Sequence, residues 1–415
     1  MFRNYFKIVF RNAKKHPLYV FINLFGLAIG MAVSIVILLY VRYELSYDNY
    51  HPDVDRIYRV SRAWFNPDGS TSLHLGHTAP PFGPLIQSDF PEDVEFSARL
   101  MNADPLIKSG NNAFVEERFF FADPEVFDVF SWETLEGESK NALTQADGLI
   151  LSESTAKRYF GSENAVGKEL LVEIGGMEFT MQVRGVVKDT PDNSHFHIDF
   201  LASMLPVVQF YGGQDAFMSN YGSNNFSTYI KLAEGVSYKN FEAKLPSLID
   251  RHMGESNSGI PMSKGTQLLL WPIQDIHLQS NLDSEIEPNG NIDYVYVYGA
   301  VALFILLIAC INFMNLSTAR SSLRSMEVGL RKVMGADKTI LIRQFMGESF
   351  VMTFLAMLIA LCLVFLFLPY FSDFLENPLS LNFLESPELL VWILGLILFV
   401  GLISGSYPAL FLSGF

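Results

Sequence analysis

The sequence predicts an α-helical membrane protein with four transmembrane spans and a mixed α+β extracytoplasmic domain between spans one and two. Three observations predict this class. Half of the 415 residues are hydrophobic, and the mean hydropathy is positive, which is unusual for a soluble domain. Four windows lack Asp, Glu, Lys and Arg, and each is long enough to cross a hydrocarbon core of about 30 Å as a helix. These windows are residues 18–41, 294–319, 349–372 and 389–415, and a long acidic segment separates the first two.

The N-terminal residues 1–16 predict an amphipathic helix on the cytoplasmic membrane surface. One helical face carries Phe2, Tyr5, Phe6, Val9 and Phe10, and the other faces carry Arg3, Lys7, Arg11 and Lys14. A polybasic flank without this helix is the alternative. Residues 17–42 form the first span. They are long for a signal peptide and are not followed by a small-residue cleavage site, so an uncleaved signal anchor is expected.

The charge distribution predicts the orientation of the spans. Basic residues gather before the first window and in residues 317–343, whereas acidic residues outnumber basic ones about two to one in residues 43–292. Short basic loops stay in the cytoplasm, so both basic clusters lie inside and residues 43–292 lie outside. The remaining spans are residues 293–318, 345–371 and 389–412, with a short outer loop at residues 372–388.

The outer domain is predicted to contain short strands and helices in two lobes. Its expected strands are residues 56–60, 96–100, 113–123, 148–152, 227–235 and 266–278, together with a hairpin around Gly175 and Gly176 within residues 168–189. Its expected helices are residues 82–94, 124–130 and 237–253, and one that starts at Ser152 or Ser154. Residues 66–84 read as a connection rich in Pro, Gly and His.

No catalytic or metal site is predicted. Residues 161–169 superficially resemble a phosphate-binding loop, but five residues separate Gly161 from Gly167, and Glu169 replaces the required Ser or Thr. His195, His197 and Asp199 alternate near Asp189 and Asp192. They could hold a metal, although an ordinary polar loop edge is the preferred interpretation. Both cysteines lie in the predicted spans, so the outer domain contains none. Its acidic charge argues against nucleic-acid binding.

Three of the polar residues within or beside the predicted spans are singled out here. Glu348 is placed at the inner end of span three, near the membrane interface rather than at mid-membrane. Asn312 and Asn315 either form interhelical hydrogen bonds or mark the cytoplasmic end of span two.

Residues 319–344 contain the most informative pattern. Apolar residues recur at helical spacing at Leu323, Met326, Leu330, Val333 and Met334. Gly335 interrupts this pattern, and a second helix is expected from Asp337 into span three. An amphipathic helix over residues 322–334 therefore lies on the inner membrane face. It could rest on lipid headgroups, act as a structural elbow, or dock a cytoplasmic protein.

The same stretch resembles the segment between the second and third spans of ABC transporter permeases of the FtsX-like, MacB type. The residues that match that family's pattern are Glu327, Val328, Gly329, Leu330, Arg331, Lys332, Gly335, Ala336, Gln344, Phe345, Glu348 and Ser349. The sequences "LILSESTAKRYFG" and "VRGVVKDTP" are similar to its extracytoplasmic domain. The order of one span, a large outer domain and three further spans also matches.

The resemblance implies a non-catalytic permease that binds no cofactor itself, because a separate cytoplasmic ATPase binds ATP and Mg. The implied ATPase-coupling residues are Arg324, Met326, Glu327, Val328, Gly329, Leu330, Arg331, Lys332, Gly335 and Ala336. ATP hydrolysis would be converted into motion of a periplasmic domain, a mechanism called mechanotransmission. The work would be export or extraction of a lipoprotein, a peptide or a drug-like substrate.

The resemblance also implies a location and further partners. The chain would cross the bacterial inner membrane several times, with a cytoplasmic N-terminus and a periplasmic domain. A second permease unit would form a homodimer, a heterodimer or the other half of a tandem chain, which the uncharged residues 389–415 would suit. Beyond the lipid bilayer, a periplasmic or outer-membrane partner is expected.

One alternative belongs to another functional class. The chain could be a membrane sensor, or a scaffold that regulates a periplasmic partner such as a cell-wall hydrolase. The identity of neighbouring gene products would separate these functions, because an ATPase favours the transporter and a hydrolase favours the scaffold.

Overall fold

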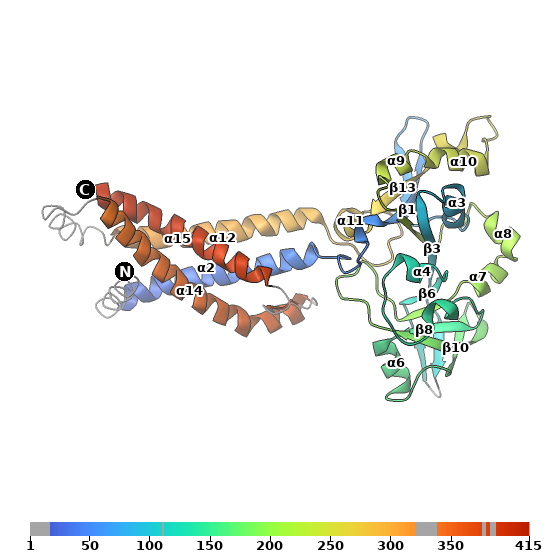
Figure 1. The fold of residues 1–415 in the computed structure, drawn as a ribbon, viewed down its shortest axis with the longest axis horizontal. Helices are drawn as coiled ribbons and strands as arrows, with labels where there is room; N and C mark the ends of the chain where they lie inside the picture. The colour runs from blue at the N-terminus through green and yellow to red at the C-terminus, as the bar shows by residue number, and fades with distance from the viewer. Residues whose placement is uncertain (1–16, 110–111, 320–337, 376–378, 382–386, 415) are drawn as a thin grey trace. The chain divides into compact units, whose positions relative to one another are not determined.

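The computed structural model describes residues 17–109, 112–319, 338–375, 379–381 and 387–414. These residues form two compact units, and Figure 1 shows the fold of each. One unit contains four long apolar helices, and the other, Ser46–Asn291, contains a mixed α/β domain. The predicted fold class is therefore confirmed. The predicted N-terminal helix over residues 1–16 and the predicted inner-face helix over residues 322–334 lie outside the described residues.

The four long helices pack as an antiparallel bundle. They are α2 (Pro17–Glu44), α12 (Ile292–Ala319), α14 (Lys338–Leu375) and α15 (Glu388–Gly414). Helix α2 contacts α12 and α14, and α15 contacts the same two helices. Each has an uncharged or nearly uncharged stretch long enough to span a bilayer. Cys310 in α12 is buried and Cys362 in α14 is exposed, and both are free thiols.

Small residues and hydrogen bonds bring α2 and α12 close together. A Cβ atom placed on Gly30 would lie 2.6 Å from the Ala309 Cβ, so only glycine permits this approach. The Ser34 hydroxyl donates to the Ala302 carbonyl at 3.0 Å. Close approach at small residues is a common basis of helix association in membranes. Asn312 also faces this interface, because its amide nitrogen lies 3.7 Å from the Cβ position of Gly26.

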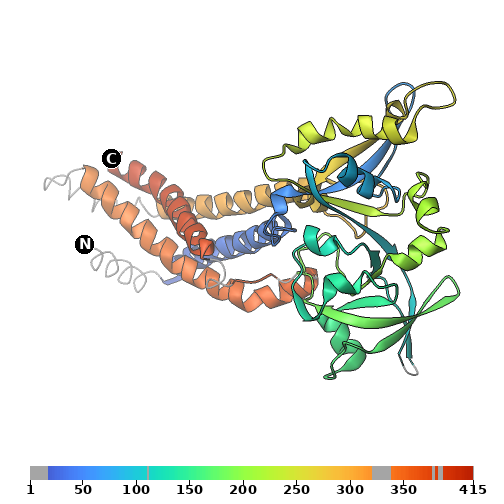
Figure 2. The ribbon, with the colours of Figure 1, turned by 45° about the vertical axis from the view of Figure 1, so that its right-hand side comes forward.

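One sheet runs through the whole outer domain, as Figure 2 shows. Its main path is β13 (Thr266–Pro272), β1 (Ile57–Phe65), β12 (Ser227–Leu232), β3 (Val94–Ala103), β6 (Phe119–Ala122), β11 (Phe200–Ser203), β8 (Gly148–Ser152), β10 (Met177–Val187), β9 (Glu169–Ile174), β4 (Leu106–Ser109) and β5 (Asn112–Val115). β2 (Thr71–Leu75) pairs with β1, and β7 (Thr134–Gly137) pairs with β10. The sheet is mixed, because β8 pairs with β10, and β6 with β11, in parallel.

Three apolar clusters form the core of the domain. Near one end of the sheet, α3 (Phe82–Asp89), α9 (Tyr238–Glu242) and α10 (Leu245–Met253) cover β13, β12 and β3. Towards the other end, α6 (Glu153–Phe160) packs on β8 and β10. A third cluster lies where α4 (Val126–Val129) packs on β3 and β12 and α11 (Ile273–Gln279) packs on β13 and β1. The two ends of the domain thus share one continuous backbone ladder.

The structure changes several predicted elements. The expected connection over residues 66–84 contains β2, which forms a hairpin with β1. The helix predicted for residues 237–253 is two helices, because Leu245 and Pro246 start a second one. The strand predicted for residues 266–278 ends at Pro272, where α11 begins. The hairpin at Gly175 and Gly176 is confirmed, since both residues have positive φ and β9 pairs with β10.

Candidate functional site

The predicted ATPase-coupling residues, from Arg324 to Ala336, lie outside the described residues, and their placement stays a prediction. Within the described part of the chain, a set of buried polar contacts holds the two ends of the outer domain, Ser46–Asn291. We call residues 46–53, which follow α2, the first connector. We call residues 280–291, which precede α12, the second connector. A loop between β10 and β11, residues 190–199, contacts both and is called the tethering loop.

The tethering loop is anchored by alternating side chains. Phe196 and Ile198 are buried in the apolar cluster around β3 and β6. The imidazoles of His195 and His197 form hydrogen bonds with polar groups, and one of these groups, the Tyr229 hydroxyl, belongs to a residue of the same cluster. The loop is therefore held both by apolar packing and by hydrogen bonds.

His195 holds the first connector through Asp48. Its Nδ1 lies 2.9 Å from Asp48 Oδ1, and its Nε2 lies 2.7 Å from the Tyr229 hydroxyl. A carboxylate only accepts hydrogen bonds, so Nδ1 carries the proton that faces Asp48. Nε2 and the Tyr229 hydroxyl form the second hydrogen bond of the ring. The side chains of His195 and Asp48 are only 2% and 1% exposed, so water competes little with these bonds.

Further bonds fix the first connector to the same loop. The Asn193 amide donates to the Ser46 carbonyl at 2.9 Å, and the Asp48 amide donates to the Asn193 carbonyl at 2.8 Å. The Ser194 and Tyr50 hydroxyls lie 3.0 Å apart. Burial raises the pKa of Tyr50 to about 12. Tyr50 therefore remains neutral at physiological pH.

His197 and Arg118 hold the second connector through Glu287. The backbone amide and Nδ1 of His197 each lie 2.9 Å from one oxygen of the Glu287 carboxylate. Arg118 approaches the same carboxylate at 3.5 Å. Burial alone would raise the pKa of Glu287, but the hydrogen bonds and charge of His197 outweigh it, and the pKa is lowered.

Arg59 makes the most deeply buried contact to the second connector. Its side chain is 1% exposed and forms a bidentate ion pair with Glu285, and it also donates to Ser280 Oγ at 2.6 Å. Burial opposes ionisation of Glu285, but hydrogen bonds from Arg59 lower its pKa below the ordinary value. This pairing compensates the burial of the Glu285 carboxylate.

The anchors of the two connectors are neighbours in the sheet. Arg59 on β1 and Tyr229 on β12 are directly opposite each other in the antiparallel register. Residues paired in this way project from the same face of a sheet. The first connector reaches Tyr229 through His195, and the second connector reaches Arg59 through Glu285. Both connectors are therefore held by residues of one cross-strand pair.

The histidine and aspartate set does not converge on one point. His195 faces Asp48, His197 faces Glu287, and Asp199 lies 3.6 Å from Arg158. Asp189 accepts a bond from the Ser154 amide at 2.9 Å. Across the described ranges, no group of three or more His, Cys, Asp or Glu side chains could hold a metal ion. In this structure the alternating histidines serve as tethers.

The structure also places three other features that the sequence raised. The stretch from Gly161 to Gly167 leads into strand β9, so it lacks the following helix N-terminus that a phosphate loop uses. Glu348 lies inside α14 and accepts a hydrogen bond from the Gln344 side chain at 3.2 Å. Ser152 is confirmed as the cap of α6, because its hydroxyl accepts from the Thr155 amide.

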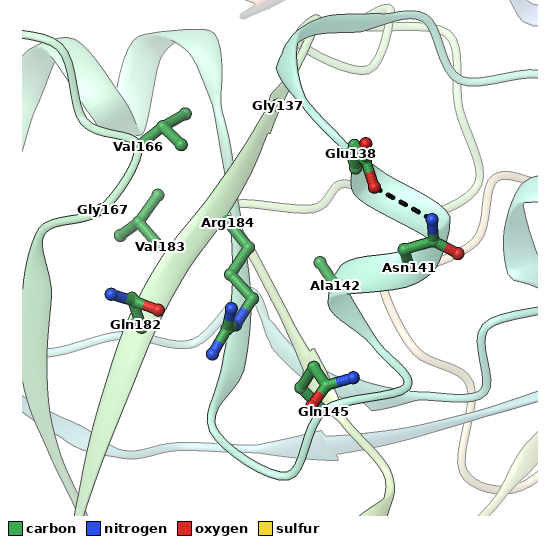
Figure 3. A pocket seen from close by; sticks show the side chains of 10 residues that line it. All are labelled: Gly137, Glu138, Asn141, Ala142, Gln145, Val166, Gly167, Gln182, Val183 and Arg184. Atoms are coloured by element: carbon green, nitrogen blue, oxygen red, sulfur yellow. Dashed lines mark hydrogen bonds between the residues drawn. The ribbon is translucent and has the colours of Figure 1, made fainter.

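A hollow of about 430 Å³ lies beside β10 and α5 (Ser139–Ala142), and Figure 3 shows its lining. Its one cationic side chain, Arg184, is already engaged, because both oxygens of Asp147 lie 2.9 Å from its Nη2. Gly137 shapes the wall, since a Cβ there would lie 2.1 Å from the Arg184 carbonyl oxygen. The cationic side chain of the hollow is thus already paired within the protein, and the connectors remain the stronger candidate site.

Sequence reasoning found the two histidines but missed their partners. Asp48, Arg59, Tyr229, Glu285 and Glu287 were not singled out. One signal was present for Arg59, which is a charged residue in the middle of an otherwise strand-forming run. The acidic partners come from segments without periodicity, and only the fold brings them together.

Two protein families match this sequence. Residues 20–248 match the MacB-like periplasmic core domain, and residues 299–415 match the FtsX-like permease C-terminal region. These matches confirm the resemblance seen in the sequence.

Among curated proteins, the pyoverdine export ATP-binding/permease protein PvdT of Pseudomonas putida is 23% identical over 326 residues, covering 71% of this chain and 44% of that protein. The macrolide export ATP-binding/permease protein MacB of Bdellovibrio bacteriovorus is 23% identical over 267 residues, covering 63% and 36%. The chain therefore spans less than half the length of these relatives.

Among solved structures, a domain described as a permease from Porphyromonas gingivalis has a TM-score of 0.44 and 22% identity, covering 54% of this chain and 91% of that one. The periplasmic region of MacB from Actinobacillus actinomycetemcomitans has a TM-score of 0.36 and 16% identity, covering 52% and 90%.

Proposed function

This chain belongs to the family of FtsX-like permeases with a MacB-like periplasmic core domain, and on that premise we propose that it is an ABC transporter permease subunit that works by mechanotransmission. A separate cytoplasmic ATPase binds ATP and Mg, and its motion is carried through the spans to the outer domain. The chain itself catalyses no reaction. The work done outside is export or extraction of a lipoprotein, peptide or drug-like substrate.

The observation that carries this proposal is the anchoring of both connectors on one cross-strand pair. A domain that follows its membrane helices must resist being pulled loose at its two attachments. Here each attachment ends in a buried charged or hydrogen-bonded side chain, and the two anchors are Arg59 and Tyr229. Displacement of either flanking helix is then delivered to β1 and β12, and from there through the continuous sheet.

The membrane part supports the same function. The four candidate spans are strongly apolar and contain at most two charged residues in their most hydrophobic stretches. Charged or strongly polar residues usually mark a path for a hydrophilic substrate through a membrane. A bundle this apolar is suited to transmitting motion. We place the domain in the periplasm, the spans in the bacterial inner membrane and the N-terminus in the cytoplasm.

We further propose that residues 324–336 dock the ATPase, and that a second permease unit completes the assembly. The docking face would combine the charges of Arg324, Glu327, Arg331 and Lys332 with close backbone approach at Gly329 and Gly335. The ATPase of the two curated relatives is named as part of the same protein, whereas here we expect it in a partner chain.

Charge reversal tests the docking proposal. The double variant Arg331→Glu, Lys332→Glu should lose at least tenfold of the co-purifying ATPase, because opposite charges across an interface would become repulsive. The matched control is Lys338→Glu, Arg343→Glu, which reverses two basic residues outside the proposed docking set and should retain the ATPase. Normal recovery of the ATPase with the first double variant would refute docking at these residues. Recovery of a cell-wall hydrolase instead of an ATPase with the unaltered chain would favour the scaffold function.

A further inference from the structure

The two connectors share an unusual backbone feature. Among the described residues, only two non-glycine residues have positive φ: Asp48, at 59°, and Ser284, at 62°. One lies in each connector. Left-handed backbone costs an L-residue about 1–2 kcal/mol, and such residues persist only where their surroundings enforce them. Their occurrence at both attachments, and nowhere else in the described chain, requires a physical explanation.

Each left-handed residue is enforced by contacts from the domain. Asp48 is held by the His195 side chain and by the Asn193 carbonyl, at 2.9 Å and 2.8 Å. Ser284 lies between two held neighbours. The Asp283 backbone bonds to His74 and Gly76, each at 2.9 Å, and Glu285 pairs with Arg59. When these contacts open, each residue can relax to an ordinary right-handed or extended conformation.

The Asp48 side chain also indicates that the first connector is strained. Its second carboxylate oxygen, Oδ2, is buried and has no hydrogen-bond partner within the described part of the molecule. An unsatisfied buried carboxylate oxygen is costly. The first connector is therefore held in a conformation that neither its backbone nor this oxygen favours on its own.

We propose that Asp48 and Ser284 are paired hinges, and that the structure shows the conformation in which both connectors are bound to the domain. In a second conformation, the first connector separates from His195 and the second connector separates from Arg59. The backbone at Asp48 and Ser284 then leaves the left-handed region. The hinges are coupled because their anchors, Tyr229 and Arg59, form one cross-strand pair. The inference rests on the proposed function for the force that drives the hinges, whereas their existence is a property of this chain alone.

Ser284 offers a clean test because its side chain is exposed. Ser284→Gly removes the cost of positive φ, whereas Ser284→Val increases it, since β-branched residues are least tolerated there. The matched control is Ser258→Val, an exposed serine whose φ is not positive. Hydrogen exchange is measured on the full-length chain in detergent micelles, and it reports local opening directly.

We expect Ser284→Val to speed exchange at the Gly76 and Asp283 amides roughly tenfold relative to Ser284→Gly, as 1–2 kcal/mol of added strain implies. The Asp48 amide should speed up as well, by a smaller factor, and Ser258→Val should change none of the three. Equal exchange in the valine and glycine variants would overturn the hinge. An effect confined to the second connector would overturn the pairing. Equal acceleration in β8 and β10 would indicate general unfolding and would also overturn it.

The result is independent of ATPase docking. The Ser284→Val chain is expected to co-purify with the ATPase normally, because its change lies in the outer domain. Failure of ATPase recovery with the unaltered chain would refute the proposed function and leave the exchange result standing.

Discussion

At the scale of single residues, His195 carries the first connector. Removing it would leave the buried Asp48 carboxylate without its side-chain partner and would also leave the Tyr229 hydroxyl unpaired. Breaking a buried pair by removing one partner typically costs about 3–5 kcal/mol. We therefore predict that His195→Ala lowers the free energy of unfolding of the outer domain by roughly that amount.

Urea unfolding of the full-length chain, followed by tryptophan fluorescence, would measure this loss. Trp64, Trp132 and Trp271 lie in the outer domain, and Trp392 lies in α15. His197→Ala is the matched control, because the His197 side chain is 16% exposed and its removal should cost about 1 kcal/mol. Equal losses in the two variants would contradict a special role for the buried histidine.

The two histidines also show how far residue-level prediction reaches. The alternation of His195, His197 and Asp199 was visible in the sequence, and a polar loop edge was preferred to a metal site. The partner of His195, Asp48, lies 147 positions away. A carboxylate has no sequence signature that pairs it with one particular histidine, so a metal site and a tether could not be separated without the fold.

At the scale of elements, the contact between α2 and α12 depends on Gly30. A side chain at this position would collide with Ala309, and overpacking of this kind costs about 1–3 kcal/mol. We predict that Gly30→Val separates the two helices enough to expose Cys310, which is fully buried next to Ala309. In a Cys362→Ser background, where Cys310 is the one remaining thiol, labelling by a membrane-permeant maleimide should accelerate about tenfold.

Gly299→Val provides the control for this experiment. Gly299 lies in α12, the helix that carries Cys310, and a Cβ at this position meets no other atom within 4 Å. Labelling of Cys310 should therefore stay at the rate of the background chain. If Gly299→Val and Gly30→Val accelerated labelling equally, the close contact at Gly30 would not be what protects Cys310.

The helices and strands that the sequence predicted correctly are those with a long hydrophobic or alternating pattern. The spans follow from more than twenty uncharged residues each, and the β9–β10 hairpin follows from two alternating runs around two glycines. β4, β7 and β11 were missed as separate strands. Each has four residues, too few for an alternation to be recognised. They are strands because a neighbouring strand supplies hydrogen bonds, and that neighbour is set by the fold.

At the scale of the whole outer domain, two histidines predict acid sensitivity. Burial lowers the pKa of His51 and of His77 to about 4, from an ordinary value of 6.5. The unfolded chain therefore binds protons below pH 6.5 that the folded domain does not bind until about pH 4. Stability is complete above pH 6.5 and falls as the pH drops to 4, with each unit of difference worth about 1.4 kcal/mol.

Unfolding of the full-length chain by urea between pH 7.5 and pH 4 would measure this slope. His51→Gln should flatten it, since glutamine has no charge to acquire. His252→Gln is the control, because this histidine already lies 2.9 Å from the Asp89 carboxylate, and its removal should not flatten the slope. A slope unchanged by His51→Gln would show that burial of this imidazole is not its source.

Under the proposed function, the order of strands in the outer sheet would make the domain a lever. The anchored strands β1 and β12 lie near one end of the strand order, and β5 forms the other end, eight strand steps from β12. At about 4.8 Å per step, that is an arm of at most about 40 Å. A rotation of about 5° at the anchors would then carry β5 through roughly 3 Å, with correspondingly less force. Displacement is then largest at β5 and force is largest near β1 and β12. Any step that needs a large force is therefore predicted to take place close to the anchored strands.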